Sequence, residues 1–291
     1  MVKNWYQSVL KSIAVSVAAA SLIACSSSGG GESGGSSDPQ GGRKTVTVSE
    51  FTGVEQSDDM WIEHITGSTY EGWMMCVKNS DDITVEVNPY LGTGADAPEL
   101  ETYVEKFKAV GGINAGGFMD EGGTGNGSIP QGIVIHNGEL LYGNPNVYQS
   151  IIGIDKDDKL VCTGGTGNDA LKWGMKEAVT FGPVFISNYE DVFDRNYQNL
   201  AMLNPRTAIG QASDGTMLLL VLDGRGPSSF GAKYEDVIDI FRSYDAVNAA
   251  NLDGGNSTAM IYNGEYVNNT VSMYGSRNLP TVFLVKEGKG N

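Results

Sequence analysis

Residues 251–260 of the sequence read Asn251-Leu252-Asp253-Gly254-Gly255-Asn256-Ser257-Thr258-Ala259-Met260. Two adjacent glycines allow positive φ angles and a close approach of the backbone to a ligand. Successive amides in such a turn can converge on an anion. Asp253 can act as a general base or nucleophile, and Ser257 and Thr258 supply hydrogen-bond donors. The alternative is a tight turn in which Asp253 caps its own backbone.

A helix is expected before this stretch, because apolar side chains recur at helical spacing in residues 237–247. A second helix is predicted to begin at Pro98, to present one apolar face as far as Val110, and to end at Gly111-Gly112. Each helix is followed by an asparagine and two adjacent glycines. These are Asn114 and Gly116-Gly117 after the helix that begins at Pro98, and Asn251 and Gly254-Gly255 after the other helix. We hypothesise that the two units lie side by side and build one cavity. The alternative is coincidence in a chain with 40 glycines.

Apolar alternation and short apolar runs predict strands between these helices. The predicted strands are residues 45–49, 83–87, 180–187, 217–222 and 281–286. Two hairpins are predicted, at residues 133–142 around Asn137-Gly138 and at residues 151–162 around Asp157-Asp158. This mixture predicts an α/β (α+β) fold, with one globular domain, a mixed twisted sheet, packed helices and Gly-rich loops that form a surface cavity.

Residues 1–24 have the features of a secretory signal, with Lys3 and Lys11 near the start and a short apolar segment after them. That segment is shorter than the roughly 20 residues that a membrane-spanning helix needs. Residues 22–25, Leu-Ile-Ala-Cys, resemble the bacterial lipoprotein box, which implies cleavage before Cys25 and lipidation of its sulfur. The alternative is an ordinary signal peptide with an incidental cysteine.

Residues 25–44 are rich in serine and glycine, which predicts a flexible tether, and the globular domain then occupies residues 45–291. The protein is therefore expected to be extracytoplasmic, on a cell surface or in the periplasm, with Cys25 as its only membrane contact. Cys76 and Cys162 form an even pair in an oxidising compartment, so one disulfide and two buried thiols are equal alternatives.

The chain is acidic, with a formal net charge of −16 over 291 residues. Residues 1–24 contain Lys3 and Lys11 as their only charged side chains, so their removal takes the charge to −18. A nucleic-acid partner is not expected, because such proteins carry a basic face. The sequence has no Cys/His cluster for zinc, no Gly-Lys-Ser/Thr motif for nucleotides, and only two histidines, both outside the motifs.

Taken together, several stretches resemble the phosphodiester glycosidase family. These stretches are residues 113–118, 181–183, 204–211, 214–215, 218–225, 251–260 and Arg277. They follow one another in the expected order over most of the globular region, and Asn256 stands where the family usually has a third glycine. The resemblance implies hydrolysis of a sugar C1–O–phosphate bond in a GlcNAc-1-phosphodiester-like substrate, releasing a sugar and a phosphomonoester.

The resemblance also implies roles for particular residues. Because phosphate is a good leaving group, stabilisation of charge should matter more than strong acid catalysis. We expect Asp253 to act on the anomeric carbon or on water, Arg206 to bind phosphate, and Asp223 to be a second carboxylate. The amides of the two Gly-Gly steps are expected to add fixed donors. The expected substrate-binding residues are Asn114, Gly116, Gly117, Phe118, Thr207, Arg225, Asn251, Gly254, Gly255, Ser257, Thr258 and Arg277.

Each of these roles has an alternative. Arg206 could pair with a structural aspartate, Asp223 could cap the turn at Gly224, and Arg225 could belong to the scaffold. The alternative function is a non-catalytic surface lipoprotein that binds sugar-phosphate polymers or exopolysaccharide and does not need Asp253. No cofactor is expected, although a calcium or magnesium ion near Asp223 and Asp253 is an open alternative. The expected partner is a glycosyl phosphodiester or a cell-envelope glycan.

Overall fold

The computed structural model describes residues 46–51, 56–194, 202–271 and 276–287. The predicted signal peptide and tether, including Cys25, lie outside these residues. Within the described ranges, no helix has the length and apolar character needed to cross a membrane.

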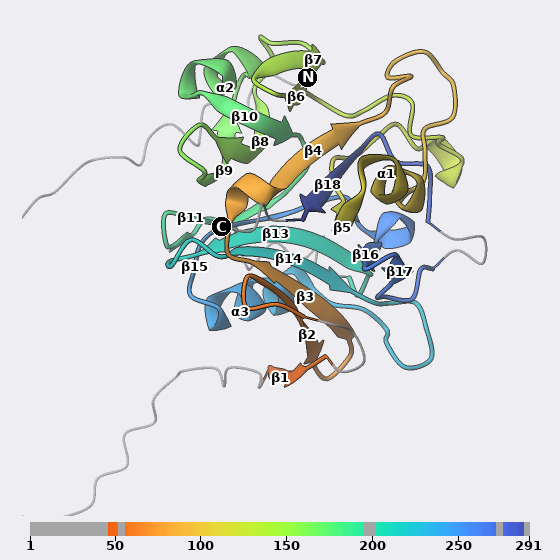
Figure 1. Cartoon of the computed structure of the whole chain (residues 1–291), viewed down its shortest axis with the longest axis vertical. Coiled ribbons are helices and arrows are strands. Elements are labelled where there is room, and N and C mark those ends of the chain that lie inside the picture. Colours follow the sequence, from red (N-terminus) through yellow and green to blue (C-terminus); the bar gives the residue numbers. More distant parts are fainter. Residues whose placement is uncertain (1–45, 52–55, 195–201, 272–275, 288–291) are drawn as a thin grey trace, which may run out of the picture. The chain divides into compact units, whose positions relative to one another are not determined.

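The fold is organised around an eight-stranded sheet, shown edge-on below the centre of Figure 1. Its strands in spatial order are β1 (Thr47–Glu50), β2 (Met60–Thr66), β3 (Glu71–Val77), β14 (Met217–Leu222), β13 (Arg206–Ala212), β15 (Ala246–Asn251), β11 (Val184–Ser187) and β12 (Glu190–Asp191). The central strand β14 is apolar on both sides. Leu218 and Leu220 pack toward α3 (Tyr234–Ser243), and Leu219 and Val221 point to the opposite face, as the two-residue period of a strand requires.

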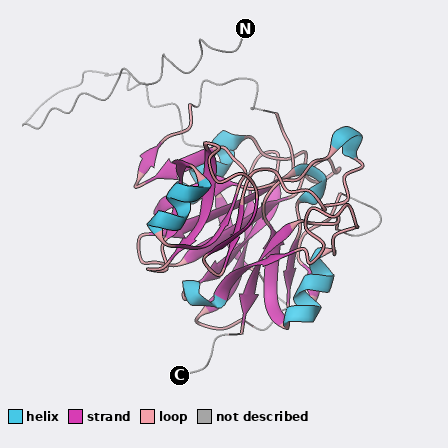
Figure 2. Ribbon diagram, turned by 90° about the horizontal axis from the view of Figure 1, so that it is seen from above, coloured by secondary structure: helices cyan, strands magenta, loops and turns pink. Residues whose placement is uncertain are grey.

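Two five-stranded sheets complete the fold. One consists of β17 (Glu265–Tyr266), β16 (Met260–Tyr262), β5 (Ala109–Asn114), β18 (Thr281–Lys286) and β4 (Ile83–Val87). The other consists of β7 (Glu139–Tyr142), β6 (Val134–His136), β10 (Met175–Val179), β8 (Gln149–Asp155) and β9 (Leu160–Gly165). Helix α1 (Leu100–Phe107) packs on the first of these sheets and α2 (Gly167–Trp173) on the second. Figure 2 shows the helices at the periphery of the stacked strands.

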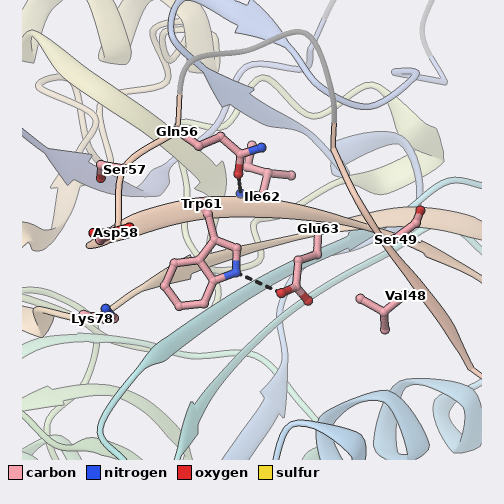
Figure 3. A pocket seen from close by; sticks show the side chains of 9 residues that line it. All are labelled: Val48, Ser49, Gln56, Ser57, Asp58, Trp61, Ile62, Glu63 and Lys78. Carbon is pink, nitrogen blue, oxygen red and sulfur yellow. Dashed lines mark hydrogen bonds between the residues drawn. The ribbon is translucent and has the colours of Figure 1, made fainter.

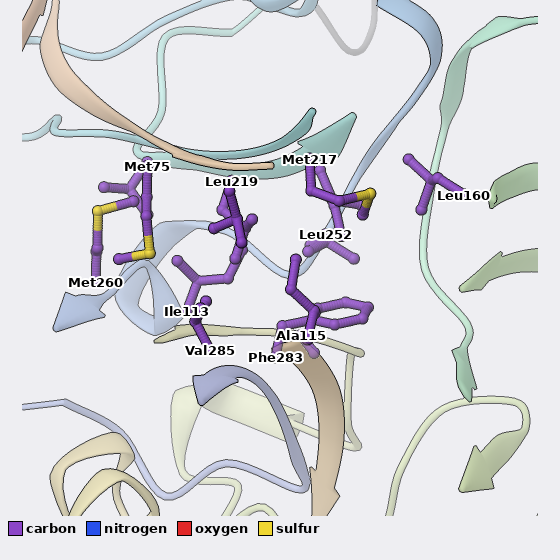
Figure 4. Close-up of a cluster of buried hydrophobic side chains, with 14 of the residues drawn as sticks. Met75, Ile113, Ala115, Leu160, Met217, Leu219, Leu252, Met260, Phe283 and Val285 are labelled. Atoms are coloured by element: carbon purple, nitrogen blue, oxygen red, sulfur yellow. The ribbon is translucent and has the colours of Figure 1, made fainter. Parts of the chain in front are cut away.

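One apolar cluster joins all three sheets (Figure 4). Met75 and Leu219 of the large sheet pack in the same cluster as Ile113 and Phe283 of the second sheet, and Leu160 joins them from the third. All five side chains are fully buried. Burial of apolar surface is the main favourable contribution to folding, at roughly 25 cal/mol per Å². The three sheets therefore depend on one common core.

The α+β class is confirmed, and so are both hairpins and the strands at β4, β14 and β18. In the β6–β7 hairpin, Asn137 and Gly138 have φ angles of 51° and 76°, as a type I′ turn requires. We expected a mixed sheet, but every strand pair among the described residues is antiparallel. Cys76 and Cys162 are buried free thiols.

Helix α1 is shorter than predicted, and the glycines expected to end it lie inside β5. The helix instead ends at Lys108, which takes a left-handed φ of 52°. A side-chain carbon at Gly111 would lie 2.8 Å from Ile261 O, and one at Gly112 would lie 2.6 Å from Phe283 O. These glycines are therefore needed because neighbouring strands approach β5 too closely for any Cβ.

A buried ion pair attaches β6 to β10. His136 Nδ1 lies 3.0 Å from Glu177 Oε2, and Glu177 is 5% exposed. Its bond to Glu177 raises the pKa of His136 above the ordinary 6.5, with weaker contributions from Glu86 and the Val85 carbonyl and an opposing effect of burial. A raised histidine pKa means that this stabilisation is complete below pH 6.5 and is lost as the pH rises through the folded-state value.

We therefore expect the melting temperature of the protein to fall as the pH rises from 6 to 8. In His136→Gln this pH-dependent part of the melting temperature should be absent, because glutamine does not titrate. Thermal unfolding measured at half-unit pH steps for both proteins tests this, and equal pH slopes would contradict it.

Candidate active site

The buried side chain of Asn114, the last residue of β5, organises the predicted site. Its Nδ2 donates to the Asp253 carbonyl at 2.5 Å, and its Oδ1 accepts from Thr207 Oγ1 at 2.7 Å and from the Ala259 amide at 3.2 Å. The Asp253 amide in turn donates to the Ala115 carbonyl at 3.0 Å. The two Gly-Gly loops therefore lie side by side, as the first part of our hypothesis states, while the cavity between them stays a prediction. Asn114 positions Asp253 instead of facing solvent.

The glycine amides do not form the open anion cradle that we expected. The Gly116 amide donates to Thr281 Oγ1 at 3.0 Å, the Gly117 amide to the Thr180 carbonyl at 3.4 Å, and the Gly255 amide to the Pro205 carbonyl at 3.0 Å. These glycines are needed for packing, since a side-chain carbon at Gly117 would lie 2.7 Å from the Phe181 ring. These three amides are therefore already hydrogen-bonded within the protein.

Asp253 follows β15 and is half-buried. Burial raises its pKa from 3.8 to about 6, while a hydrogen bond from Ser257, the positive charge of Arg277 and the Gly254 amide lower it less strongly. The nearby carboxylate of Asp120 adds to the increase. Asp253 is thus a carboxyl group whose protonation changes near neutral pH, a common property of catalytic acids and bases.

Arg277 is held next to this carboxylate by other groups. It forms a bidentate pair with Asp120, with N–O distances of 2.5 and 2.8 Å, and donates to the Gly125 carbonyl at 2.7 Å. Its guanidinium carbon lies 4.9 Å from the centre of the Phe118 ring. Because Asp120 already neutralises its charge, Arg277 is better suited to orienting this region than to binding a phosphate. Asp120 was not predicted from the sequence.

Asp223 lies at the end of β14 and is 4% exposed. Burial raises its pKa, and hydrogen bonds from Asn269 and Asn268 oppose this effect. The donors are the Asn269 amide at 3.1 Å, Asn269 Nδ2 at 2.8 Å and Asn268 Nδ2 at 3.2 Å. Asn268 also accepts from the Met260 amide at 2.7 Å. Asp223 therefore anchors the segment that follows the Asp253 loop.

Asn268 and Asn269 were not predicted from the sequence either. The only available signal was two consecutive amide side chains a few residues after the motif, with no periodicity or spacing to link them to Asp223.

Arg206 does not present its guanidinium to a substrate in this structure. It is 7% exposed, stacks 4.1 Å from the centre of the Tyr234 ring, and donates to the Ala232 carbonyl at 2.9 Å and to the Met202 carbonyl at 2.7 Å. We therefore no longer assign phosphate binding to Arg206. Arg206 holds two loop segments together, a role that neither the clamp nor the ion-pair alternative anticipated.

Arg225 is the exposed cation beside the Asp253 loop. Its Nη2 donates to Asn204 Oδ1 at 2.9 Å and its Nη1 to Asn256 Oδ1 at 2.5 Å. A side-chain carbon at Gly255 would lie 3.3 Å from Arg225 Nη2, so the guanidinium rests against this loop. No carboxylate in the described residues forms a salt bridge with it. Its φ of 60° is unusual for a residue with a side chain.

The other predicted contacts are mostly buried around this loop. Thr207, Asn251, Ser257, Thr258 and Phe118 are all less than 5% exposed. Asn251 Nδ2 donates to the Gly182 carbonyl at 3.0 Å, but Asn251 Oδ1 and Thr258 Oγ1 have no hydrogen-bond partner. Buried polar atoms without partners are rare in protein cores. Within the described residues, Gln149 Nε2 and Tyr266 OH also lack a partner.

A separate pocket lies near the start of β2 (Figure 3). Trp61, Gln56 and Lys78 are among the residues that line it. Two of these side chains are hydrogen-bonded within the protein: Trp61 Nε1 donates to Glu63 Oε1 at 2.9 Å, and Gln56 Oε1 accepts from the Ile62 amide at 2.8 Å. None of the predicted site residues lines this pocket. Elsewhere in the described part of the chain, no group of three or more His, Cys, Asp or Glu side chains could hold a metal ion.

The model of the family described as phosphodiester glycosidase matches residues 107–286 of this sequence. This range contains β5, the Asp253 loop, Arg225 and Arg277, which together form the site described above. The match covers more than half of the chain, and the chain belongs to the phosphodiester glycosidase family.

Two curated proteins are similar to parts of this chain. The chain is 25% identical over 233 residues to the SPbeta prophage-derived uncharacterized protein YomE of Bacillus subtilis (strain 168), covering 77% of this chain and 36% of that protein. It is 25% identical over 150 residues to the N-acetylglucosamine-1-phosphodiester alpha-N-acetylglucosaminidase of Mus musculus, covering 46% of this chain and 29% of the mouse protein. The chain therefore spans about a third of the length of the curated relatives that it matches.

A solved structure has the same fold. The zebrafish N-acetylglucosamine-1-phosphodiester alpha-N-acetylglucosaminidase catalytic domain, auto-inhibited by its pro-peptide, superposes with a TM-score of 0.64 at 19% identity, over 84% of this chain and 88% of that one. A protein from Synechocystis has a TM-score of 0.53 at 15% identity and covers 77% of this chain and 62% of its own.

The position of Asp253 has a consequence for stability. A carboxyl pKa raised to about 6 in the folded state, from 3.8, means that ionised Asp253 destabilises the fold at pH 7. Asp253→Asn should therefore increase the free energy of unfolding at pH 7 by about 1–2 kcal/mol, and by less at pH 5. Urea denaturation at both pH values measures this. Asp157→Asn, which changes an exposed carboxylate, is the control and should have little effect, and a less stable Asp253→Asn protein at pH 7 would contradict the expectation.

Proposed function

We propose that the protein hydrolyses the C1–O–phosphate bond of a glycosyl phosphodiester and releases a sugar and a phosphomonoester. The observation that carries this proposal is that two groups come from different loops that touch: Asp253 belongs to the loop after β15, and Arg225, from the loop after β14, rests against Gly255 of that loop. Asp253 is a half-buried carboxyl with a pKa of about 6, and Arg225 is an exposed guanidinium that rests against Gly255. A carboxylate suits the anomeric carbon and a cation suits the phosphate, and membership of the family supports the same reaction class.

In this proposal the ionised carboxylate of Asp253 acts on the anomeric carbon, or on a water molecule that attacks it. The phosphate leaves with the C1–O bond electrons, so negative charge develops on it. Arg225 stabilises this charge, and its orientation is fixed in advance by Asn204 and Asn256. Asn114 holds the backbone of Asp253, and Arg277 favours the ionised carboxylate.

For the sugar, we propose α-linked N-acetylglucosamine. Support comes from the mouse and zebrafish relatives, both of which are N-acetylglucosamine-1-phosphodiester alpha-N-acetylglucosaminidases. We also propose that residues 1–24 direct export and that lipid on Cys25 anchors the domain to a membrane outside the cytoplasm, where envelope glycans would be its substrates. This proposal is supported by the sequence features of residues 1–44.

The first test measures release of free sugar from a GlcNAc-α-1-phosphodiester. We expect turnover by the parent protein, and loss of at least a hundredfold in kcat in Asp253→Asn. Because the ionised form is required, kcat/KM of the parent should rise with pH through an apparent pKa of about 6.

The control for this test is Asp157→Asn, which should keep full activity. Substrate binding by the parent without any release of sugar, across a panel of glycosyl phosphodiesters, would favour the binding-protein alternative instead.

A second test addresses phosphate recognition. Arg225→Gln should lower kcat/KM by ten- to a hundredfold and remove most of its salt dependence, because a cation that faces solvent contributes through charge. Arg242→Gln is the matched control, since Arg242 already pairs with Asp191. An unchanged kcat/KM in Arg225→Gln would contradict the assignment.

A further inference from the structure

The pocket near the start of β2 has no part in the proposed hydrolysis (Figure 3). We call it the Trp61 pocket, after the aromatic residue that lines it. Its volume is about 480 Å³, which is in the range of pockets that bind small molecules. The opposite end of β2 faces the candidate active site, because the Thr69 carbonyl accepts at 2.8 Å from the Phe230 amide in the loop that carries Arg225. The seven residues of β2 span roughly 20 Å, so the two sites are separate.

Trp61 is held in one orientation at this pocket. Its Nε1 donates to Glu63 Oε1 at 2.9 Å, and Glu63 Oε2 accepts from the hydroxyl of Tyr244, the residue at which α3 ends. The indole also packs partly against the apolar cluster on the α3 side of the large sheet. A side chain that is fixed before binding loses little conformational entropy when a ligand stacks on it. Glu63 and Tyr244 therefore preorganise an indole surface that is only half-buried.

Lys78 leaves room for a ligand at this indole. Its Nζ lies 5.8 Å from the centre of the Trp61 ring, whereas atoms in van der Waals contact are about 3.5–4.0 Å apart. The Lys78 side chain is exposed, so its ammonium group is free to move aside and to donate a hydrogen bond to a bound molecule. The indole is therefore accessible to a flat apolar surface.

The charges in the Trp61 pocket indicate that its ligand is neutral. Asp58 and Glu63 are acidic and Lys78 is basic, so an anion meets two carboxylates and a cation meets an ammonium group. The exposed hydroxyl of Ser49 can both donate and accept. A sugar ring fits this combination, because it has an apolar C–H face that stacks on an aromatic ring and hydroxyl groups around its edge.

We propose that the Trp61 pocket binds a sugar residue of a neutral glycan, stacked on the Trp61 indole and hydrogen-bonded by Asp58 and Lys78. This inference does not depend on the proposed hydrolysis, because none of the residues assigned to that reaction lines the pocket. A glycan bound there is held on the same domain as the candidate active site. The local concentration of any reactive linkage on the same polymer is thereby raised.

Binding of neutral trisaccharides tests the Trp61 pocket without requiring turnover. By calorimetry and saturation-transfer NMR, the protein should bind at least one of chitotriose, cellotriose, maltotriose and mannotriose, and should bind it more tightly than the anionic trigalacturonate. Trp61→Ala should weaken this binding by about tenfold or more. Trp173→Ala, which alters a tryptophan that is 41% exposed on α2, is the matched control and should bind as the parent does.

Asp58→Ala is a second variant, chosen because Asp58 is exposed and its removal leaves the core intact. It should weaken binding by about threefold or more. The proposal is overturned if the parent binds none of the four neutral trisaccharides, or if both variants bind them as tightly as the parent does. Binding that is lost in Asp253→Asn but kept in Trp61→Ala would place the sugar at the candidate active site, which also overturns it. Binding that requires Trp61, in a protein that hydrolyses no glycosyl phosphodiester, would support the pocket and contradict the proposed function.

Discussion

The hydrogen bonds of the Asn114 side chain are the constraint on which the site depends. This one amide links β5 to the backbone of Asp253, to Thr207 on β13 and to Ala259 before β16. Its donor and acceptor are both satisfied within the protein, so replacement of Asn114 by an apolar residue would leave the Thr207 hydroxyl and the Ala259 amide without this acceptor. The two sheets that face each other across the common core are thereby fixed in register at the point where the candidate catalytic carboxylate emerges.

Burial and neighbouring charges together set the pKa of Asp253. Burial makes the carboxylate harder to ionise, and Arg277 partly reverses that effect because it is locked beside it by Asp120. A carboxylate that was fully exposed would be ionised at all relevant pH values but poorly oriented. The structure instead combines strong positioning with a carboxyl pKa near neutrality, as enzymes that work by acid–base or nucleophilic chemistry often do. The loss of folding stability at this position accompanies that function.

The sequence predicted the elements better than the contacts. Strands β4 and β14 followed from local alternation and apolar runs, and the family resemblance located the Asp253 loop. Sequence could not distinguish Arg206 from Arg225, because both follow turn-like residues and only tertiary packing buries the first against Tyr234. Nor could it show that Gly111-Gly112 would lie inside a strand, since the reason is the approach of Phe283 and Ile261 from distant parts of the chain.

The position of strand β18 in its sheet affects how the protein folds. It lies between β5 and β4 in its sheet, although almost 200 residues separate it in sequence from β4. Residues 83–114 therefore cannot complete their sheet until residues 281–286 have been synthesised and have closed a very long loop. Folding that depends on such distant pairings is slow, and the incomplete chain exposes unpaired strand edges. Assembly of the site is thus a late event in the biogenesis of the molecule, and a chain truncated before β18 would be a substrate for quality-control proteases.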